Sequence, residues 1–345
     1  MTLMIDSHPE KDATRLPKVS VLWLNYNTNH IKSAIEKILT SLVRIDYPNF
    51  ELIVVDNGST DGSWELIQNF INYNIFQKIQ IKMLKLKNNY GFCGGYNAAY
   101  AMRDPDTKYV LLVNTDAIPN QNIINEYVHF MESNVNVGAL QGIVESFESK
   151  KVDSAGFYFN DIVAIRSPFI NKNIDQVLKY LNNPVELSYV EGTMPMYRVD
   201  AVEKVIFSKN NLYLTAGFMY YLEDMLLSTL LWGSGYKCVL IPKVVGRHLR
   251  GAIMKKHRIR YLYSVRNRVA FLVISNSPYR IVIPILWCLK FIFFKPNAKL
   301  SHVRALIDGI RLGKALKKQY RIIDFHNVPR FKVTIKGLIR TIFID

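Results

Sequence analysis

An acidic residue, Asp116, stands just beyond a short apolar run. Residues 110–113 read Val-Leu-Leu-Val, and Asn114, Thr115 and Asp116 follow them. Four apolar residues bounded by polar ones predict a strand that is buried on both faces, as in a parallel sheet. Open α/β sheets bind ligands at the carboxyl ends of such strands, where a carboxylate can hold a divalent cation and, through it, a phosphate. A polar loop that caps the strand is the alternative, and this stretch alone leaves both interpretations open.

Polar turns also follow two earlier apolar runs. Residues 19–24 and 50–55 predict strands, and each of them ends in a polar loop. A third polar turn, residues 88–97, is rich in glycine and leads into a helix. Its glycines do not follow the G-x-G-x-x-G pattern, and no Walker lysine comes after them. The turn therefore argues against a redox Rossmann enzyme and against a P-loop enzyme.

A pair of acids, Glu223 and Asp224, lies at the start of an apolar stretch. The stretch has helical spacing and stops at Gly233, which is a typical helix end. Both carboxylates therefore fall in the first turn of a predicted helix. Negative charge is stabilised at that position, so a purely structural explanation is available for the pair.

Predicted strands and helices alternate along the first part of the chain. Strand patterns at residues 19–24, 50–55 and 79–86 lead up to the one at residues 110–113, with helical patterns between them. This alternation is typical of an α/β fold in which helices cover both faces of a doubly wound sheet. Further along, in a polar and irregular stretch, residues 152–159 predict an edge hairpin.

Composition narrows the class of protein. The chain has 345 residues, 49% of them apolar, which suits one large or two modest domains. Its three cysteines form no C-x-x-C pair, which argues against a disulfide framework or a zinc site and favours a reducing compartment. Residues 1–17 are polar, contain no apolar segment of the kind found in signal peptides, and predict a flexible leader.

Positive charge is concentrated in the last part of the chain. The net charge is +16, and residues 247–345 contain 22 Lys and Arg against three Asp, which is +19. The first 246 residues therefore carry −3. A near-neutral body with a basic tail predicts a polyanionic partner, which is nucleic acid, an anionic membrane surface or a phosphorylated substrate.

The apolar content of the tail favours the membrane. Residues 279–294 are apolar, but they are too short and too interrupted to predict a membrane span. Together with Trp287 and the basic amphipathic pattern of residues 303–316, they predict an element at the surface of an anionic bilayer. Nucleic acid is disfavoured because the aromatic residues gather in apolar runs instead of alternating with the charges. A plain core helix is the alternative for residues 281–294.

Taken in order along the chain, these motifs resemble those of one enzyme family. The matching stretches are residues 21–27, 54–62, 89–97, 113–116, 192–198 and 221–224, and His248. Together they resemble glycosyltransferase family 2, whose members are inverting enzymes of the GT-A fold, and within it the rhamnosyltransferase-like branch. The likeness covers roughly residues 19–270.

The resemblance implies a division of the chain. A GT-A catalytic domain would occupy residues 18–250, with a nucleotide-binding half at about 18–118 and an acceptor half at about 119–250. The basic, partly apolar residues 251–345 would form a helical region on the membrane.

The resemblance further implies that the strand-end residues bind a nucleotide-diphosphate sugar. Asp56 has the alternative role of capping its turn, and the glycine-rich turn has that of an ordinary helix entry. The implied donor-binding residues are Asn25, Asn27, Asp56, Asn89, Gly91, Gly94, Asn97, Asn114 and Thr115.

A divalent cation, Mg²⁺ or Mn²⁺, is implied as well, because it neutralises charge on the departing nucleotide. Asp116 is the implied ligand, and His248 would complete the site, although a lone histidine is as often structural. Asn114 replaces the first Asp of the family's D-x-D pattern, which leaves one charged ligand fewer.

Asp224 is the implied general base, with Glu223 as the neighbouring alternative. The family usually has another Asp where this chain has Leu226, and often an Arg within residues 229–232. The implied contacts of the diphosphate or acceptor are Gly192, Thr193, Arg250 and Arg266.

The function expected from the sequence is an inverting transfer of a hexosyl or deoxyhexosyl group to a hydroxyl of a glycan or lipid-linked glycan. It would serve polysaccharide biosynthesis or protein glycosylation, peripherally on the cytoplasmic face of the cell membrane. Two alternatives are a catalytically silent binding protein of the same fold and a nucleic-acid-binding protein. A sugar-nucleotide pyrophosphorylase is disfavoured because no basic glycine-rich signature lies near the N-terminus.

Overall fold

The computed structural model of the protein describes most of the chain. Of residues 257–260, 294 and 299 it describes the backbone alone. The expected leader lies almost entirely outside the described residues, as does Arg250. The described ranges are 16–73, 79–213, 222–249, 257–294, 299–319 and 326–335, with residue 337.

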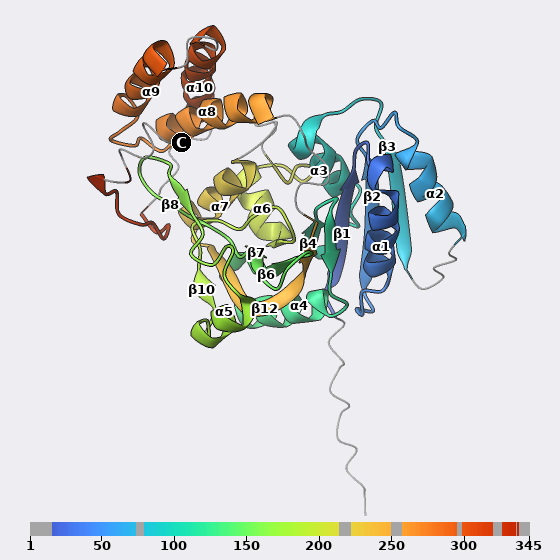
Figure 1. Cartoon of the computed structure of the whole chain (residues 1–345). Helices are drawn as coiled ribbons and strands as arrows, with labels where there is room; N and C mark the ends of the chain where they lie inside the picture. Colours follow the sequence, from blue (N-terminus) through green and yellow to red (C-terminus); the bar gives the residue numbers. More distant parts are fainter. Residues whose placement is uncertain are drawn as a thin grey trace, which may run out of the picture.

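A mixed sheet of ten strands forms the centre of the molecule (Figure 1). Its strand order is β10-β12-β6-β11-β4-β1-β2-β3, with β5 paired to β12 and β7 paired to β6. Strands β4, β1, β2 and β3 are parallel, whereas β11 runs antiparallel between β4 and β6. The bounds are β1 (Lys18–Asn25), β2 (Phe50–Asp56), β3 (Gln80–Lys85), β4 (Thr107–Val113), β5 (Ala117–Pro119), β6 (Val137–Ser146), β7 (Val152–Ser154), β8 (Tyr158–Phe159), β9 (Ile165–Arg166), β10 (Val185–Glu186), β11 (Met196–Arg198) and β12 (Lys237–His248).

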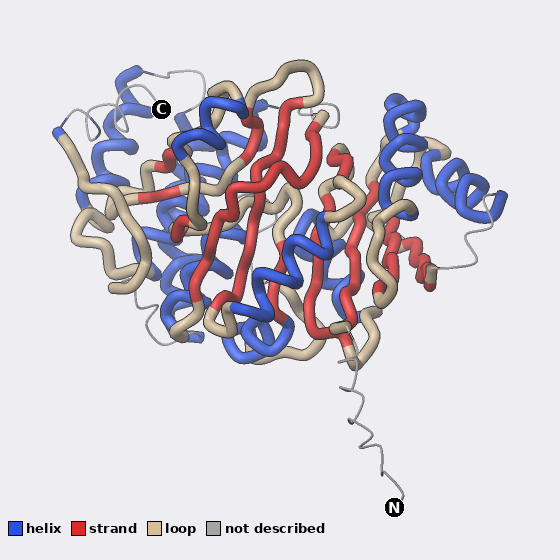
Figure 2. Tube along the Cα trace, turned by 90° about the horizontal axis from the view of Figure 1, so that it is seen from below, coloured by secondary structure: helices blue, strands red, loops and turns tan. Residues whose placement is uncertain are grey.

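Helices cover both faces of this sheet (Figure 2). Leu22 and Leu24 of β1 belong to one hydrophobic cluster, and Val21 and Trp23 belong to another, because alternate side chains of a strand point to opposite faces. Helices α3, α6 and α7 contribute to the first cluster, and α1, α2 and α4 contribute to the second. The bounds are α1 (Lys32–Val43), α2 (Ser63–Tyr73), α3 (Gly91–Ala101), α4 (Ile123–Ser133), α5 (Ile174–Tyr180), α6 (Val199–Ile206), α7 (Glu223–Gly233), α8 (His257–Ile274), α9 (Val282–Phe294) and α10 (Lys299–Gln319). The expected α/β sheet is therefore confirmed.

The last three helices lie at the end of the molecule opposite β3 (Figure 1). Helices α8 and α10 approach closely because α10 presents Gly309 and Gly313 to α8. A Cβ atom at Gly309 would lie 2.4 Å from the backbone oxygen of Arg266, and one at Gly313 would lie 2.8 Å from that of Ala270. Phe271 of α8 and residues of α9 and α10 share the first hydrophobic cluster with the sheet. The three helices are therefore packed onto the body of the protein.

The hairpin expected at residues 152–159 is wrong. Strand β7 pairs with β6, whereas β8 pairs with β9, so the two halves of this segment join different sheets. A short run of this kind is compatible with either arrangement, because the sequence does not show which strand is its partner. Helix α5, which the sequence did not predict, follows, and the Asn173 side chain caps it by accepting bonds from the N–H groups of Asp175 and Gln176.

Strand β12 continues past Pro242 to His248. Its pairing with β6 changes register between Leu240 and Val244, so the proline falls in an irregular part of the ladder. Beyond it, β12 pairs with β5, and His248 lies opposite Ala117. The long strand thus brings His248 next to the end of the Asn114-Thr115-Asp116 stretch.

None of the helices in the described part of the chain is both long enough and apolar enough to cross a membrane.

Candidate active site

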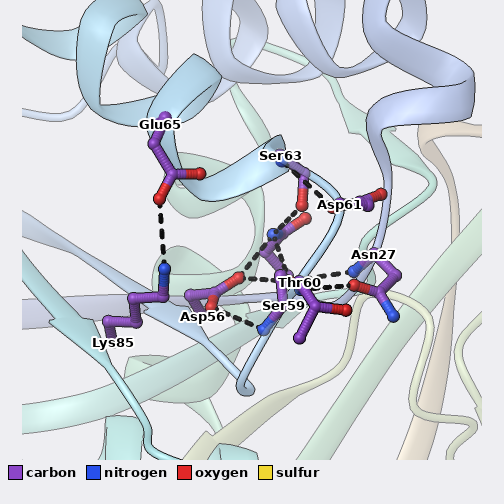
Figure 3. Close-up of polar contacts among 9 residues, drawn as sticks. Asn27, Asp56, Ser59, Thr60, Asp61, Ser63, Glu65 and Lys85 are labelled. Atoms are coloured by element: carbon purple, nitrogen blue, oxygen red, sulfur yellow. Dashed lines mark hydrogen bonds and ion pairs between the residues drawn. The ribbon is translucent and has the colours of Figure 1, made fainter.

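The ends of β1 and β2 are joined by buried hydrogen bonds. The Asn25 side chain donates to Asp56 Oδ1 (2.7 Å), and the backbone N–H of Ser59 donates to Asp56 Oδ2 (2.9 Å). Ser59 Oγ also donates to Asp56 Oδ1 (2.5 Å), and Thr60 N–H donates to the Asn27 side chain (2.9 Å) (Figure 3). Asn25 and Asp56 have no exposed surface. Asp56 therefore fixes this turn, and its predicted contact with a nucleotide stays a prediction.

Asn57 ties the same turn to the glycine-rich turn that begins α3. Its Nδ2 donates to the carbonyl oxygen of Gly91 (2.9 Å) and to Asn89 Oδ1 (3.1 Å), and its Oδ1 accepts from Tyr90 N–H (2.9 Å). Gly91 has a φ of +73°, a left-handed conformation that favours glycine. The predicted donor-binding residues of both turns are thus held against each other.

Asn97 has a different set of partners from those expected. Its Oδ1 accepts from the N–H groups of Leu212 and Tyr213 (2.9 and 2.8 Å), and its Nδ2 donates to the Tyr213 carbonyl (2.9 Å). Asn97 is 6% exposed. In the structure it anchors the chain that leads toward α7, and its predicted contact with a nucleotide stays a prediction.

Asp116 and His248 are brought together from positions 132 residues apart. Asp116 Oδ1 lies 2.8 Å from His248 Nε2, and Asp153 Oδ2 lies 2.7 Å from His248 Nδ1. All three side chains are buried. Burial by itself would lower the pKa of His248, but the hydrogen bonds with Asp116 and then Asp153 raise it to about 9. The imidazole is therefore held between two carboxylates.

Gly192 and Thr193, which precede β11, connect the end of β4 to the start of α7. The Thr193 carbonyl accepts from Asn114 N–H (2.9 Å), and Gly192 N–H donates to Asp224 Oδ2 (3.3 Å). A Cβ atom at Gly192 would lie 3.1 Å from the Phe92 ring, so the segment passes close to α3. Adjacent residues of one backbone thus contact both Asn114 and Asp224.

Three carboxyl groups gather at the start of α7. Asp224 Oδ1 accepts from Met225 N–H (2.8 Å), and Glu191 is near enough to affect its titration. Burial and then Glu191 raise the pKa of Asp224, while burial and then Asp224 raise that of Glu223. Leu222, the residue before the helix, has a φ of +75°, which is strained for leucine and typical of functional sites. A carboxylate with a raised pKa is a stronger base.

The family is decided by a match that covers more than half of the chain. A family model described as glycosyl transferase family 2 matches residues 20–206. The chain is a family-2 glycosyltransferase. The matched part contains Asn25, Asp56, Asn114 and Asp116, and α7 and His248 lie beyond it.

Two relatives are similar in sequence to part of this glycosyltransferase. An uncharacterized glycosyltransferase of Haemophilus influenzae is 24% identical over 197 residues, which are 57% of this chain and 57% of the relative. The poly(ribitol-phosphate) beta-N-acetylglucosaminyltransferase TarS of Staphylococcus aureus is 28% identical over 117 residues, 33% of this chain and 19% of TarS. The chain thus spans less than two thirds of either relative.

Solved structures share the fold. The crystal structure of S. aureus TarS superimposes with a TM-score of 0.53 and 17% identity, over 86% of this chain and 49% of that one. The mannosyltransferase PcManGT from Pyrobaculum calidifontis, in complex with GDP-Man and Mn²⁺, gives a TM-score of 0.52 and 17% identity, over 89% and 83%. The predicted GT-A fold is confirmed, and the rhamnosyltransferase-like branch stays a prediction.

Two side chains of this glycosyltransferase have the chemistry to hold a divalent cation. Asp116 offers a carboxylate oxygen, which suits Mg²⁺ or Mn²⁺, and His248 offers Nε2 when its imidazole is neutral. Asp153 holds the other ring nitrogen, as partners of metal-bound histidines commonly do. Among the described residues, no group of three or more His, Cys, Asp or Glu side chains is arranged for a metal. The pair fits a site that substrate phosphates would complete.

Arg266 and Arg250 are the two arginines that the sequence predicts to contact the diphosphate or the acceptor. Arg266 lies in α8 over the ring of Tyr263 (4.7 Å), and its backbone contacts Gly309 of α10. Burial lowers its pKa, and Tyr263 and Asp308 oppose this effect. Arg250 lies outside the described residues. The predicted roles of both arginines stay predictions.

Three predicted donor-binding residues remain: Asn114 and Thr115, where β4 ends, and Gly94 in α3. Asn114 accepts a bond from Thr115 N–H through its side-chain oxygen (3.1 Å), and Thr115 Oγ1 donates to the Leu24 carbonyl (2.5 Å). Gly94 packs against Tyr90, because a Cβ atom there would lie 2.6 Å from Tyr90 Cβ.

Sequence reasoning missed Asn57, Asp153 and Glu191. Asn57 directly follows Asp56 and could have been included on that ground. Asp153 and Glu191 carry no such signal, because their partners are distant in sequence.

Proposed function

We propose that this glycosyltransferase transfers one sugar, with inversion, from a nucleotide-diphosphate sugar to a hydroxyl group of a glycan acceptor. The observation that carries the proposal is the link from Asn114 through Thr193 and Gly192 to Asp224. It holds a candidate diphosphate site and a candidate base at a fixed separation. Pre-set positions of this kind lower the barrier of a displacement between two substrates.

Asp224 is the proposed general base. In an inverting displacement the acceptor hydroxyl attacks the anomeric carbon on the side opposite the nucleotide, and the base takes the hydroxyl proton. The N–H groups of Gly192 and Met225 orient the Asp224 carboxylate, and its raised pKa makes it a better proton acceptor. Glu223 is the neighbouring candidate.

The donor diphosphate is proposed to lie against Asp116 and His248. A divalent cation held by these two residues would supply charge neutralisation for the departing nucleotide. The Mn²⁺ and GDP-Man in the mannosyltransferase complex support this assignment. The strand-end residues Asn25, Asn27 and Asp56 and the turn at Asn89 and Gly91 would shape the pocket for the nucleoside.

We further propose a peripheral position on the cytoplasmic face of the cell membrane, with a lipid-linked glycan as acceptor. Helix α9 buries Ile283, Trp287 and Phe291, but it exposes another apolar face. Basic residues follow it in α10, so anionic lipid would be attracted to the same surface. The exposed apolar residues of α9 and the chain just before it are Ile281 (65%), Val282 (48%), Ile285 (54%), Leu289 (45%), Ile292 (39%) and Phe293 (70%).

The proposed function is tested by a thermal-shift screen of nucleotide sugars with Mn²⁺, followed by product analysis. The cognate donor should raise the melting temperature only with the cation present, because ligands that bind the folded state stabilise it. NMR of the product should show the anomeric configuration opposite to that of the donor. Retained configuration contradicts the mechanism, and donor binding with neither transfer nor hydrolysis would identify a silent binding protein.

A further inference from the structure

A cavity of about 790 Å³ is lined by none of the residues placed in the candidate active site. Its volume is in the range of small-molecule sites. The β8–β9 hairpin and residues 166–168 form one side, α8 and α9 form another, and Phe331, Thr334 and Gly337 close it. Three separate parts of the chain, distant in sequence, therefore build this space.

The charges around the cavity are of one sign. Arg166, Arg268 and Lys290 line it, and no acidic residue is among the described residues that do so. Lys290 is only 8% exposed, which is rare for a lysine and places its charge in the interior. Ser167 Oγ, also in the lining, has no hydrogen-bond partner within the described structure. This lining suits an anion that offers several acceptor oxygens.

Aromatic and apolar surface accompanies these charges. Trp287, Tyr261 and Tyr158 line the same cavity, and the Arg166 guanidinium lies 4.5 Å from the centre of the Phe331 ring. Such surface suits a ligand whose phosphate is attached to a sugar or a hydrocarbon, since inorganic phosphate alone would leave it unused.

The cavity is electrostatically connected to the candidate base. Burial raises the pKa of Tyr189, Asp224 raises it further, and Arg268 opposes them. The hydroxyl of Tyr189 therefore lies in the electrostatic field of both a cavity residue and the proposed base. The Tyr189 ring also packs against Phe157, which precedes β8, and Phe159, which ends it (5.3 and 6.4 Å between ring centroids).

Helix α9 connects the cavity to the apolar surface. Trp287 and Lys290 face the cavity, whereas Ile285 and Leu289 are about half exposed. One helix thus forms both a cationic wall and an apolar exterior. A ligand with a charged phosphate and a long hydrocarbon chain matches this pair of surfaces.

We propose that this cavity binds the phosphate or diphosphate of a lipid-linked acceptor, with the hydrocarbon chain leaving along α9. The inference rests on the proposed function in that it assigns the acceptor side of the same reaction. The acceptor would enter from the lipid surface, and its phosphate would anchor it while the distal sugar reaches Asp224.

The test is a direct binding measurement with farnesyl diphosphate as probe, made with EDTA so that no cation can recruit it to Asp116 and His248. We expect binding to the full chain, and about tenfold weaker binding for Lys290→Gln and for Arg268→Gln, since each loses a charge-assisted contact. Arg44→Gln removes the same charge from an exposed side chain just after α1, outside the cavity lining, and should change the dissociation constant less than twofold.

Arg166→Gln keeps the test valid if a buried substitution prevents folding. Arg166 is exposed, so its variant should fold, and it should weaken binding about fivefold. Unchanged affinity in Arg166→Gln and Lys290→Gln, or an equal loss in Arg44→Gln, overturns the site. Farnesol should bind at least tenfold more weakly, and inorganic pyrophosphate that binds as tightly as farnesyl diphosphate overturns the lipid assignment in favour of soluble phosphates. No turnover is required, so a failure of the transferase chemistry would not alter these results.

Discussion

The end of β2 and the start of α7 use their carboxylates in opposite ways. Asp56 is fully buried, and amide, hydroxyl and backbone donors satisfy both its oxygens. Asp224 accepts two backbone bonds but stands beside Glu223 and Glu191. A satisfied network stabilises the fold, whereas like charges held together cost stability and raise the pKa. Whether a buried acid supports structure or chemistry therefore depends on the groups around it.

A large loss of activity is expected on substitution of Asp116, the candidate ligand of the cation at the donor diphosphate. Asp116→Asn removes the charged oxygen of the candidate cation pair, so the transfer rate should fall more than about 100-fold. Stabilisation of the protein by nucleotide and Mn²⁺ should be lost in the same variant. Asp175→Asn, at an exposed position of α5, is the matched control and should behave as the wild type. Equal nucleotide binding with and without Mn²⁺ in the wild type contradicts the assignment.

The next effect is a loss of stability, expected on substitution of the buried Asp56. Asp56→Ala leaves the buried Asn25 and Ser59 donors without their acceptor, which should lower the free energy of unfolding by about 3 kcal/mol. Urea denaturation of both proteins at pH 7 measures the difference. A loss below about 1 kcal/mol would show that this network does not hold the turn.

Asp224→Asn should change stability in the opposite direction. Because the folded-state pKa is raised, the folded protein retains a proton that the unfolded chain releases above about pH 4. Wild-type stability should therefore fall as the pH rises from about 4 into the neutral range. The variant should show a shallower slope, which Glu223 maintains through its own raised pKa, and should gain about 1–2 kcal/mol at pH 8. Parallel pH profiles of the two proteins, without donor or cation, contradict the raised pKa.

Strands β1, β2 and β4 could be predicted because they are buried on both faces and therefore read as unbroken apolar runs. The turns that follow them could be located for the same reason. Asp153 could not be predicted, since its partner His248 is 95 residues away and meets it only through the pairing of β7 and β12 with β6. The insertion of β11 between β4 and β6, which places Gly192 beside Asp224, has no local signal either.

The burial of helix α9 could not be predicted from the sequence either. Residues 281–294 were expected to be either interfacial or core, and the structure gives α9 one buried and one exposed apolar face. A continuous apolar run hides this division, because the pattern does not show which face has a partner.

The smallest effect on stability is expected for Glu65, a carboxylate on the protein surface. Glu65 pairs with Lys85 at 3.1 Å near the end of β2, with 59% and 41% of the two side chains exposed (Figure 3). Because exposed ion pairs contribute little, Glu65→Gln should cost no more than about 0.5 kcal/mol. A cost similar to that of Asp56→Ala would mean that burial does not separate the two carboxylates.

The assignment of Asp224 as the base is tested most directly by the transfer rate of Asp224→Asn at saturating donor and acceptor, measured alongside nucleotide binding. The rate should fall about 10²- to 10⁴-fold, as is usual on loss of a general base, while the dissociation constant of nucleotide with Mn²⁺ stays within twofold. Glu223→Gln should lose less than tenfold. A rate close to that of the wild type in Asp224→Asn, or a greater loss in Glu223→Gln, contradicts the assignment.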